Sequence, residues 1–339
     1  MKLWFTRGVW VSGNARSKAA ALSIASVRKI AVIRHAALGD MVLTRSFLVE
    51  LKKAFPNAKI TLSVASHYMR GTPDDLVDRI HIVHGTDQRR AKFGEKYARF
   101  KELGRQDIIF DLAATPRSFL TCVLNKATLK IGFPYREMQR RLFYDIAVPR
   151  SDLNFEVDDM MSQLHSLGVR TRYPHRFNMP GIPIRRNRPF LIFFTGASTP
   201  AKCWPEDHFS KLIDRLSADY PALDHLLLKG INPWESGESI IRPLIDRPNV
   251  ATVEADTIEE TVNLLLGASL VIANDTGIRN LAIVCEVPTV GIFFATDPYR
   301  YWPRHSGMHE IVLLADGGVP TVDDLYASCT RILSGETVN

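Results

Sequence analysis

From Lys29 onwards, the chain alternates short runs of β-branched and apolar residues with longer stretches of helical periodicity. This alternation constrains the fold more than any other feature, because it is typical of a parallel sheet covered by helices. We predict strands over residues 30–34, 60–64, 79–83, 107–112, 190–194, 226–228, 270–273 and 288–293. We predict helices from the turn at residues 37–40 through residue 51, and over residues 206–216, 257–266 and 278–285.

The periodicity is lost between about Arg170 and Pro189, where prolines, a glycine and several arginines cluster. A length of 339 residues is also about twice that of a usual domain. We therefore expect two Rossmann-like α/β domains, residues 29–180 and 181–339, whose parallel sheets face a central cleft at the carboxyl ends of their strands. A C-terminal helix that packs back on the first domain is compatible with this arrangement.

Composition narrows the class of protein further. The chain is 46% hydrophobic and 23% charged, which is enough to build large cores, and no apolar run is long enough to span a membrane. Its four cysteines are far apart in the sequence, so we expect neither a disulfide framework nor a metal site, and a cytoplasmic location fits best. The formal net charge of +7 favours anionic partners, but nucleic-acid-binding motifs are absent, so we expect no nucleic acid partner.

The segment before the first predicted strand, residues 1–28, is basic and carries no acidic residue. Its cations are accompanied by apolar side chains, namely those of Trp4, Phe5, Val9, Trp10 and Val11. Two interpretations stay open: a poorly ordered extension, or a segment that docks the protein peripherally on the anionic surface of the inner membrane.

Two motifs of the second half follow predicted strands. Asp275, Thr276 and Gly277 stand where a strand gives way to a helix, so backbone N–H groups and the helix dipole favour a phosphate there, while Asp275 accepts from sugar hydroxyls. Ser198 and Lys202 follow the strand at 190–194 and suit a diphosphate. Each motif also has an ordinary structural interpretation, as a helix cap for the first and as a surface lysine for the second.

In the first half, Asp40 places a carboxylate where the first strand gives way to its helix. A carboxylate there suits a general base, although helix capping is the ordinary role of an aspartate in this position. The G-x-G-x-x-G fingerprint is missing from this turn, which argues against a nicotinamide or flavin enzyme.

The motifs above belong to a longer series of short motifs that runs along the chain. They are Ile33-Arg34, Leu38-Gly39-Asp40-Met41-Val42, Leu51-Lys52, Phe55-Pro56 with Ala58 and Ile60, Asp111-Leu112 with Arg117-Ser118, Lys130-Ile131-Gly132-Phe133, Gly196-Ala197-Ser198 with Lys202 and Trp204-Pro205, and Asn274-Asp275-Thr276-Gly277 with Ala282 and Pro288. Together they resemble the ADP-heptose:lipopolysaccharide heptosyltransferases of glycosyltransferase family nine, over nearly everything after Lys29.

The resemblance implies a GT-B fold, with the acceptor held mainly by the first domain and the nucleotide-sugar donor by the second. It also implies roles for individual residues: Asp40 as the catalytic base, and Ser198, Lys202, Glu235, Asp275, Thr276 and Gly277 as donor-binding residues, with Glu238 competing with Glu235 for the ribose. The chain departs from the family at Asn280, where a histidine is usual, and at Ala36-Ala37, where hydroxyl residues are common. Asn280 is a further candidate donor contact, and Arg117 and Arg136 are candidate acceptor contacts.

The expected activity is inverting transfer of heptose from ADP-heptose to a lipopolysaccharide core acceptor. No D-x-D triplet occurs in the chain, so we expect neither a metal nor another cofactor. Two alternatives stay open: an enzyme that uses a different nucleotide-sugar, or a protein that binds nucleotides or glycans without turnover.

Overall fold

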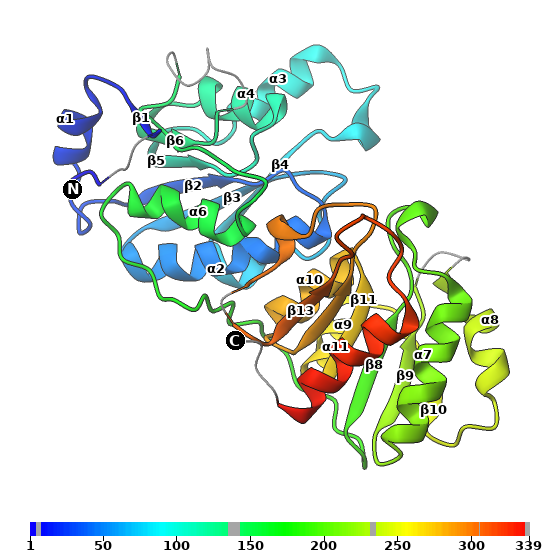
Figure 1. The fold of residues 1–339 in the computed structure, drawn as a ribbon. Coiled ribbons are helices and arrows are strands. Elements are labelled where there is room, and N and C mark those ends of the chain that lie inside the picture. Colours follow the sequence, from blue (N-terminus) through cyan, green and yellow to red (C-terminus); the bar gives the residue numbers. More distant parts are fainter. Residues whose placement is uncertain (5–7, 135–142, 231–234, 305, 336–339) are drawn as a thin grey trace. The chain divides into compact units, whose positions relative to one another are not determined.

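The computed structural model describes residues 1–4, 8–134, 143–230, 235–304 and 306–335 (Figure 1). The chain divides into two compact units, Met1–Arg176 and Phe177–Asn339. The division lies close to the boundary after residue 180 that the loss of periodicity predicts. Each unit is an α/β layer structure built on its own sheet.

The first unit contains a seven-stranded sheet in the order β1-β7-β6-β5-β2-β3-β4. Its strands are β1 (Trp10–Val11), β2 (Lys29–Ile33), β3 (Lys59–Ala65), β4 (Arg79–Val83), β5 (Gln106–Asp111), β6 (Ala127–Gly132) and β7 (Ile146–Ala147). All neighbours pair in parallel except β1, which runs antiparallel to β7. The two central strands β2 and β5 are almost wholly buried, as expected for a sheet covered on both faces.

Helices cover both faces of this sheet (Figure 1). They are α1 (Ala15–Ala20), α2 (Leu38–Ala54), α3 (Phe93–Lys101), α4 (Pro116–Leu124) and α6 (Glu156–His165), with short 3-10 turns η1 (Asp74–Leu76) and η2 (Thr86–Gln88). Helices α2 and α6 pack against each other, and α3 packs against α4. Phe47 of α2 meets Phe110 of β5 edge to face with ring centroids 5.3 Å apart, which fixes α2 on the sheet.

The N-terminal segment belongs to the first unit rather than extending from it. Strand β1 adds an antiparallel edge to the sheet, and Ala15 and Ala19 of α1 are fully buried. The Lys18 ammonium lies 2.6 Å from the Asp145 carboxylate, and the Trp4 amide donates to the Ser166 carbonyl. The described part of residues 1–28 is therefore packed, and the interpretation as a poorly ordered extension is wrong.

The second unit contains a six-stranded, wholly parallel sheet in the order β10-β9-β8-β11-β12-β13. Its strands are β8 (Phe190–Phe194), β9 (Asp224–Leu228), β10 (Val250–Val253), β11 (Leu270–Asn274), β12 (Thr289–Ile292) and β13 (His309–Val312). Its helices are α7 (Glu206–Asp219), α8 (Glu238–Ile241), α9 (Ile258–Gly267), α10 (Gly277–Val284) and α11 (Val322–Ser334), with 3-10 turns η3 (Pro200–Lys202), η5 (Arg242–Leu244) and η6 (Tyr299–Tyr301).

Two helix layers enclose this second sheet (Figure 1). Helix α7 packs against α8 and α11, and α9 packs against α10. The C-terminal helix α11 contributes Leu325 and Cys329, both fully buried, to the same core as Trp204 and Phe209. None of the helices in the described residues combines the length and the apolar composition that crossing a membrane requires.

Candidate active site

Each sheet has a point where the chain leaves two adjacent strands in opposite directions. In the first sheet this switch point lies between β2 and β5, and in the second it lies between β8 and β11. Loops that leave the carboxyl ends of such strand pairs form the ligand sites of doubly wound folds. The loop after β2 leads to Asp40, and the loops after β8 and β11 carry Lys202 and Asp275.

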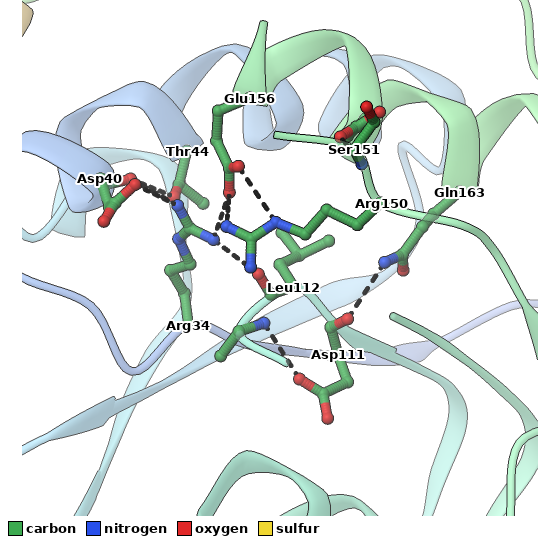
Figure 2. A network of polar contacts seen from close by, with 11 residues as sticks. Arg34, Asp40, Thr44, Asp111, Leu112, Arg150, Ser151, Glu156 and Gln163 are labelled. Atoms are coloured by element: carbon green, nitrogen blue, oxygen red, sulfur yellow. Dashed lines mark hydrogen bonds and ion pairs between the residues drawn. The ribbon is translucent and has the colours of Figure 1, made fainter. Parts of the chain in front are cut away.

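Asp40 is held by an arginine and does not cap its helix. The N-cap of α2 is Ala37, no side-chain cap hydrogen bond is made there, and Asp40 lies in the first turn. The Arg34 guanidinium donates from Nη2 to Asp40 Oδ1 at 3.2 Å, and Asp40 keeps a quarter of its side chain exposed (Figure 2). The carboxylate is thus fixed in direction yet open to a substrate, as a general base must be.

Arg34 belongs to a buried network of charges (Figure 2). Its Nη1 atom lies 2.8 Å from Oε1 of Glu156, the first residue of α6, and also donates to the Leu112 carbonyl. Arg150 donates to both oxygens of Glu156, at 2.6 and 3.1 Å. Burial raises the pKa of Glu156, and the guanidinium groups of Arg34 and Arg150 oppose that rise. The network ties β2, α2 and α6 together behind Asp40.

A second buried carboxylate shapes the loop after β5. Gln163 donates to the Asp111 carbonyl at 3.0 Å (Figure 2). The Asp111 carboxylate accepts from the Ala113 amide at 3.0 Å and from the Tyr144 hydroxyl at 2.7 Å. Burial raises the pKa of Asp111. Because Asp111 is fully buried and points into its own loop, it organises the approach to α4 rather than reaching a substrate.

A chain of histidines runs beside this edge of the sheet. His81 Nε2 lies 2.8 Å from the Arg99 carbonyl, which only accepts, so His81 Nδ1 accepts from Ser63, 2.9 Å away. Ser63 Oγ in turn accepts from His35 Nε2 at 3.2 Å. His35 is therefore protonated on Nε2, and burial lowers its pKa to about 3, so the ring is neutral.

The two candidate acceptor contacts have different outcomes. Arg117 is the second residue of α4 and lies close enough to His35 and His67 to lower the pKa of both rings. This places a half-buried cation at the carboxyl edge of the first sheet. Arg136 lies outside the described residues.

In the second unit, Lys202 and Asp275 meet across the switch point. Lys202 Nζ lies 2.8 Å from Asp275 Oδ2, and the same oxygen accepts from Thr296 Oγ1 at 2.8 Å. Lys202 is therefore more than a surface lysine. The cap interpretation also fails, because the N-cap of α10 is Thr276 and it makes no side-chain cap hydrogen bond. The Thr276 side chain therefore accepts no hydrogen bond from the N–H groups at the start of α10, which begins at Gly277.

Glu235 lies against two strand ends. A Cβ atom added at Gly196 or at Gly230, which follow β8 and β9, would collide with the Glu235 carboxylate. Glu235 is almost fully buried, whereas Glu238 is exposed at the start of α8, so the fold favours Glu235 as the acid at this edge. Ser198 is exposed in the loop after β8.

Comparison with known proteins now identifies the family. Residues 97–323, more than half of the chain, match glycosyltransferase family 9 (heptosyltransferase). The chain belongs to this family. It is 25% identical over 294 residues to lipopolysaccharide heptosyltransferase 3 of Escherichia coli, covering 80% of this chain and 84% of that protein. It is also 25% identical over 334 residues to lipooligosaccharide heptosyltransferase 2 of Haemophilus ducreyi, covering 86% and 90%.

Solved structures show the same fold. E. coli heptosyltransferase WaaC with ADP-2-deoxy-2-fluoro heptose aligns with a TM-score of 0.71 at 20% identity, covering 91% of this chain and 100% of that one. E. coli ADP-heptose lps heptosyltransferase II aligns with a TM-score of 0.67 at 19% identity, covering 91% and 100%. The predicted GT-B fold is confirmed, and this member of family 9 is a glycosyltransferase.

Two residues that shape the site of this glycosyltransferase, Asn274 and Glu156, were given no role of their own from the sequence. Asn274 is fully buried, donates to the Thr195 carbonyl at 2.7 Å and accepts from the Trp204 amide at 3.1 Å, so it ties the Lys202 loop to β11. Its place before Asp275 in a strand-to-helix junction was the available signal. Glu156 gave no such signal, because it stands far from Asp40 in the sequence. In the described residues, His, Cys, Asp and Glu side chains do not gather in a group of three or more that would hold a metal ion.

Proposed function

We propose that this family 9 glycosyltransferase transfers heptose from ADP-heptose to a sugar of a lipopolysaccharide core, with inversion at the anomeric carbon. The observation that carries the proposal is the Lys202–Asp275 pair at the start of α10, in the same unit as the buried Glu235 at the ends of β8 and β9. A cation, a free helix N-terminus and an acid for the ribose are the groups that a nucleoside diphosphate sugar needs. The fold match to a heptosyltransferase structure with ADP-2-deoxy-2-fluoro heptose supports ADP-heptose as the donor.

In the proposed reaction, Asp40 takes the proton of an acceptor hydroxyl as its oxygen attacks the anomeric carbon. The bond between that carbon and the diphosphate breaks, and ADP leaves on the opposite face of the sugar. Arg34 keeps the base oriented, since it holds Asp40 Oδ1 from a fully buried position. Lys202 and the start of α10 stabilise the charge that develops on the diphosphate.

The donor is tested by thermal unfolding with ADP, UDP and GDP, followed by mass spectrometry of the product formed from ADP-heptose and a heptose-deficient core. A ligand that binds only the folded state raises its stability. We expect ADP alone to raise the melting temperature and the product to gain one heptose. Stabilisation by UDP or GDP instead would favour a different nucleotide-sugar as the donor. This alternative is suggested by Asn280, which is buried and stands where the family usually has a histidine.

We propose that protein groups, rather than a divalent cation, neutralise the leaving diphosphate. The contact of Lys202 with the donor-site carboxylate Asp275 supports this assignment. Turnover is then expected to be unchanged in excess EDTA, measured as ADP release. A loss of activity in EDTA that magnesium restores would contradict it.

Because the proposed acceptor is part of a lipopolysaccharide, we further propose that the N-terminal segment docks on the anionic membrane surface. Lys2 and Trp4 are both exposed there, with the Lys2 ammonium 4.9 Å from the Trp4 ring centroid. Deleting the segment would remove β1 from the sheet, so the matched test is Lys2→Glu against Lys211→Glu, an exposed lysine of the other unit. Weaker cosedimentation with anionic vesicles for Lys2→Glu alone is expected at low salt, and equal binding would contradict docking.

A further inference from the structure

Arg279 is a fully buried cation at the start of the donor-site helix. It is the third residue of α10 and has no exposed surface. Its Nη1 atom donates to the Tyr301 carbonyl at 2.9 Å, while Nε and Nη2 are buried and have no hydrogen-bond partner within the described ranges. An arginine buried without a carboxylate partner is unusual, because burial disfavours a charge that nothing nearby balances.

The surroundings of Arg279 show that the fold makes room for this charge. The guanidinium carbon lies 5.1 Å from the Phe293 ring centroid, and a side chain at Gly291 would collide with Nε. Burial lowers the pKa of Arg279 to about 10, and the nearby Asp275 opposes this. The group therefore remains protonated at neutral pH, in a setting that supplies aromatic and backbone contacts but no full countercharge.

The position of the guanidinium connects it with the donor site. Gly291 lies near the carboxyl end of β12, where it pairs with Ala273 just before the Asp275 motif. Asp275, the acid whose charge acts on Arg279 among the described residues, already holds Lys202. Two cations thus share one carboxylate at the N-terminus of α10, where the helix dipole adds further positive potential.

We propose that Arg279 is a second cation of the donor site, whose buried charge stabilises the diphosphate of the nucleotide-sugar at the start of α10. This inference rests on the proposed function. It adds to the proposed donor site a residue, Arg279, that sequence analysis did not select for donor binding. The charge acts through the low-dielectric interior, so its effect grows with the charge on the ligand. The excess positive charge at this helix start is balanced when the donor binds.

The inference predicts opposite effects on the free and the liganded protein. Arg279→Met removes a buried, incompletely balanced charge and keeps an unbranched apolar chain, so the melting temperature without ligand should stay equal or rise. The dissociation constant for ADP should rise by roughly tenfold or more, that for AMP by less, and that for adenosine hardly at all. Arg279→Lys keeps the charge and should retain most of the ADP affinity.

The experiment is calorimetric titration of the full chain with ADP, AMP, adenosine and inorganic pyrophosphate, alongside thermal unfolding. The control is Arg247→Met, which removes an arginine paired with Asp214 at the surface, and should leave ADP binding unchanged. Equal ADP affinity in the parent and Arg279→Met proteins would overturn the inference while leaving the donor assignment intact. Equal losses in the Met and Lys variants, extending to adenosine, would also overturn it, because they would indicate that Arg279 only holds the Tyr301 loop. A parent that binds neither ADP nor pyrophosphate would overturn both the inference and the proposed function.

Discussion

The carboxyl edges of the two sheets balance their charges in different ways. In the first unit, the Glu156 carboxylate is enclosed by Arg34 and Arg150, and Arg34 also holds Asp40, so two cations face two anions. In the second unit, Asp275 pairs with Lys202, while the buried Arg279, on which Asp275 also acts, leaves two guanidinium nitrogens without a hydrogen-bond partner in the described residues.

This difference matches what each edge has to do. A general base must be oriented before the acceptor arrives, and a charge-balanced network holds it without help from a ligand. A donor site gains affinity when the ligand completes its charge balance, because the diphosphate then replaces a missing countercharge. Under the proposed assignment, the network that orients Asp40 is already formed in the free protein, whereas the charge of Arg279 is balanced only when the donor binds.

The strongest test of the balanced edge removes its central carboxylate. Glu156→Gln leaves Arg34 and Arg150 buried beside a neutral amide, and we expect a loss of about 3 kcal/mol in the free energy of unfolding. Urea unfolding measures this. Glu254→Gln is the control, because that acid forms its ion pair with Lys229 at the surface, where solvent screens the pair, and the change should leave stability nearly unaltered. A Glu156→Gln protein as stable as the parent would show that the network is not structural.

A second test on the first unit concerns Asp40, the proposed general base. Asp40→Asn keeps the side-chain shape and an oxygen for Arg34 but removes the proton acceptor. We expect turnover to fall by roughly 100-fold, with the ADP dissociation constant nearly unchanged, since the base acts only in the transition state. Near-normal turnover of the purified variant would remove Asp40 from the base role.

A further test concerns the buried, neutral ring of His35, which lies after β2 at the carboxyl edge of the first sheet. Burial lowers the pKa of His35 from 6.5, its value in the unfolded chain, to about 3. The stability that comes from keeping this ring neutral is therefore fully present above pH 6.5 and is lost as the pH falls toward 3. Between pH 6.5 and 5 the parent should lose about 2 kcal/mol more unfolding free energy than His35→Gln does. Urea unfolding at several pH values compares the two proteins, and parallel pH profiles would rule this contribution out.

The last test concerns Lys202, at the carboxyl edge of the second sheet. Lys202→Ala should weaken ADP binding by about tenfold and lower turnover as well, because a cation beside a diphosphate acts in both the ground and the transition state. Calorimetry and steady-state kinetics measure the two effects, and Lys202→Arg should keep most of both. An ADP dissociation constant equal to that of the parent would mean that Lys202 does not contact the donor phosphates.

Much of the fold was predictable because its central strands are buried on both faces. Their apolar runs, such as residues 190–194 and 270–273, stand out from the amphipathic helices around them, and each predicted strand and helix is present. Four of the missed strands, β1, β7, β10 and β13, are short, and β6, although six residues long, has only three buried residues. Strand β10 has no buried residue, and β7 spans two residues, so neither leaves an apolar signature. The packing of the described part of residues 1–28 was missed because β1 is defined only by its pairing with β7.

Local sequence patterns were enough to locate the candidate site residues, because Asp40, Lys202 and Asp275 each follow a strand, and parallel strands bring such positions to one edge of a sheet. How these groups are held depends on contacts between distant parts of the chain. Glu156 reaches Arg34 from a helix more than a hundred residues away, and Arg279 became a buried cation because Gly291 and Phe293 of another strand region enclose it. Local patterns record the period of a strand or helix, whereas charge pairing and burial depend on neighbours that the chain brings together only on folding.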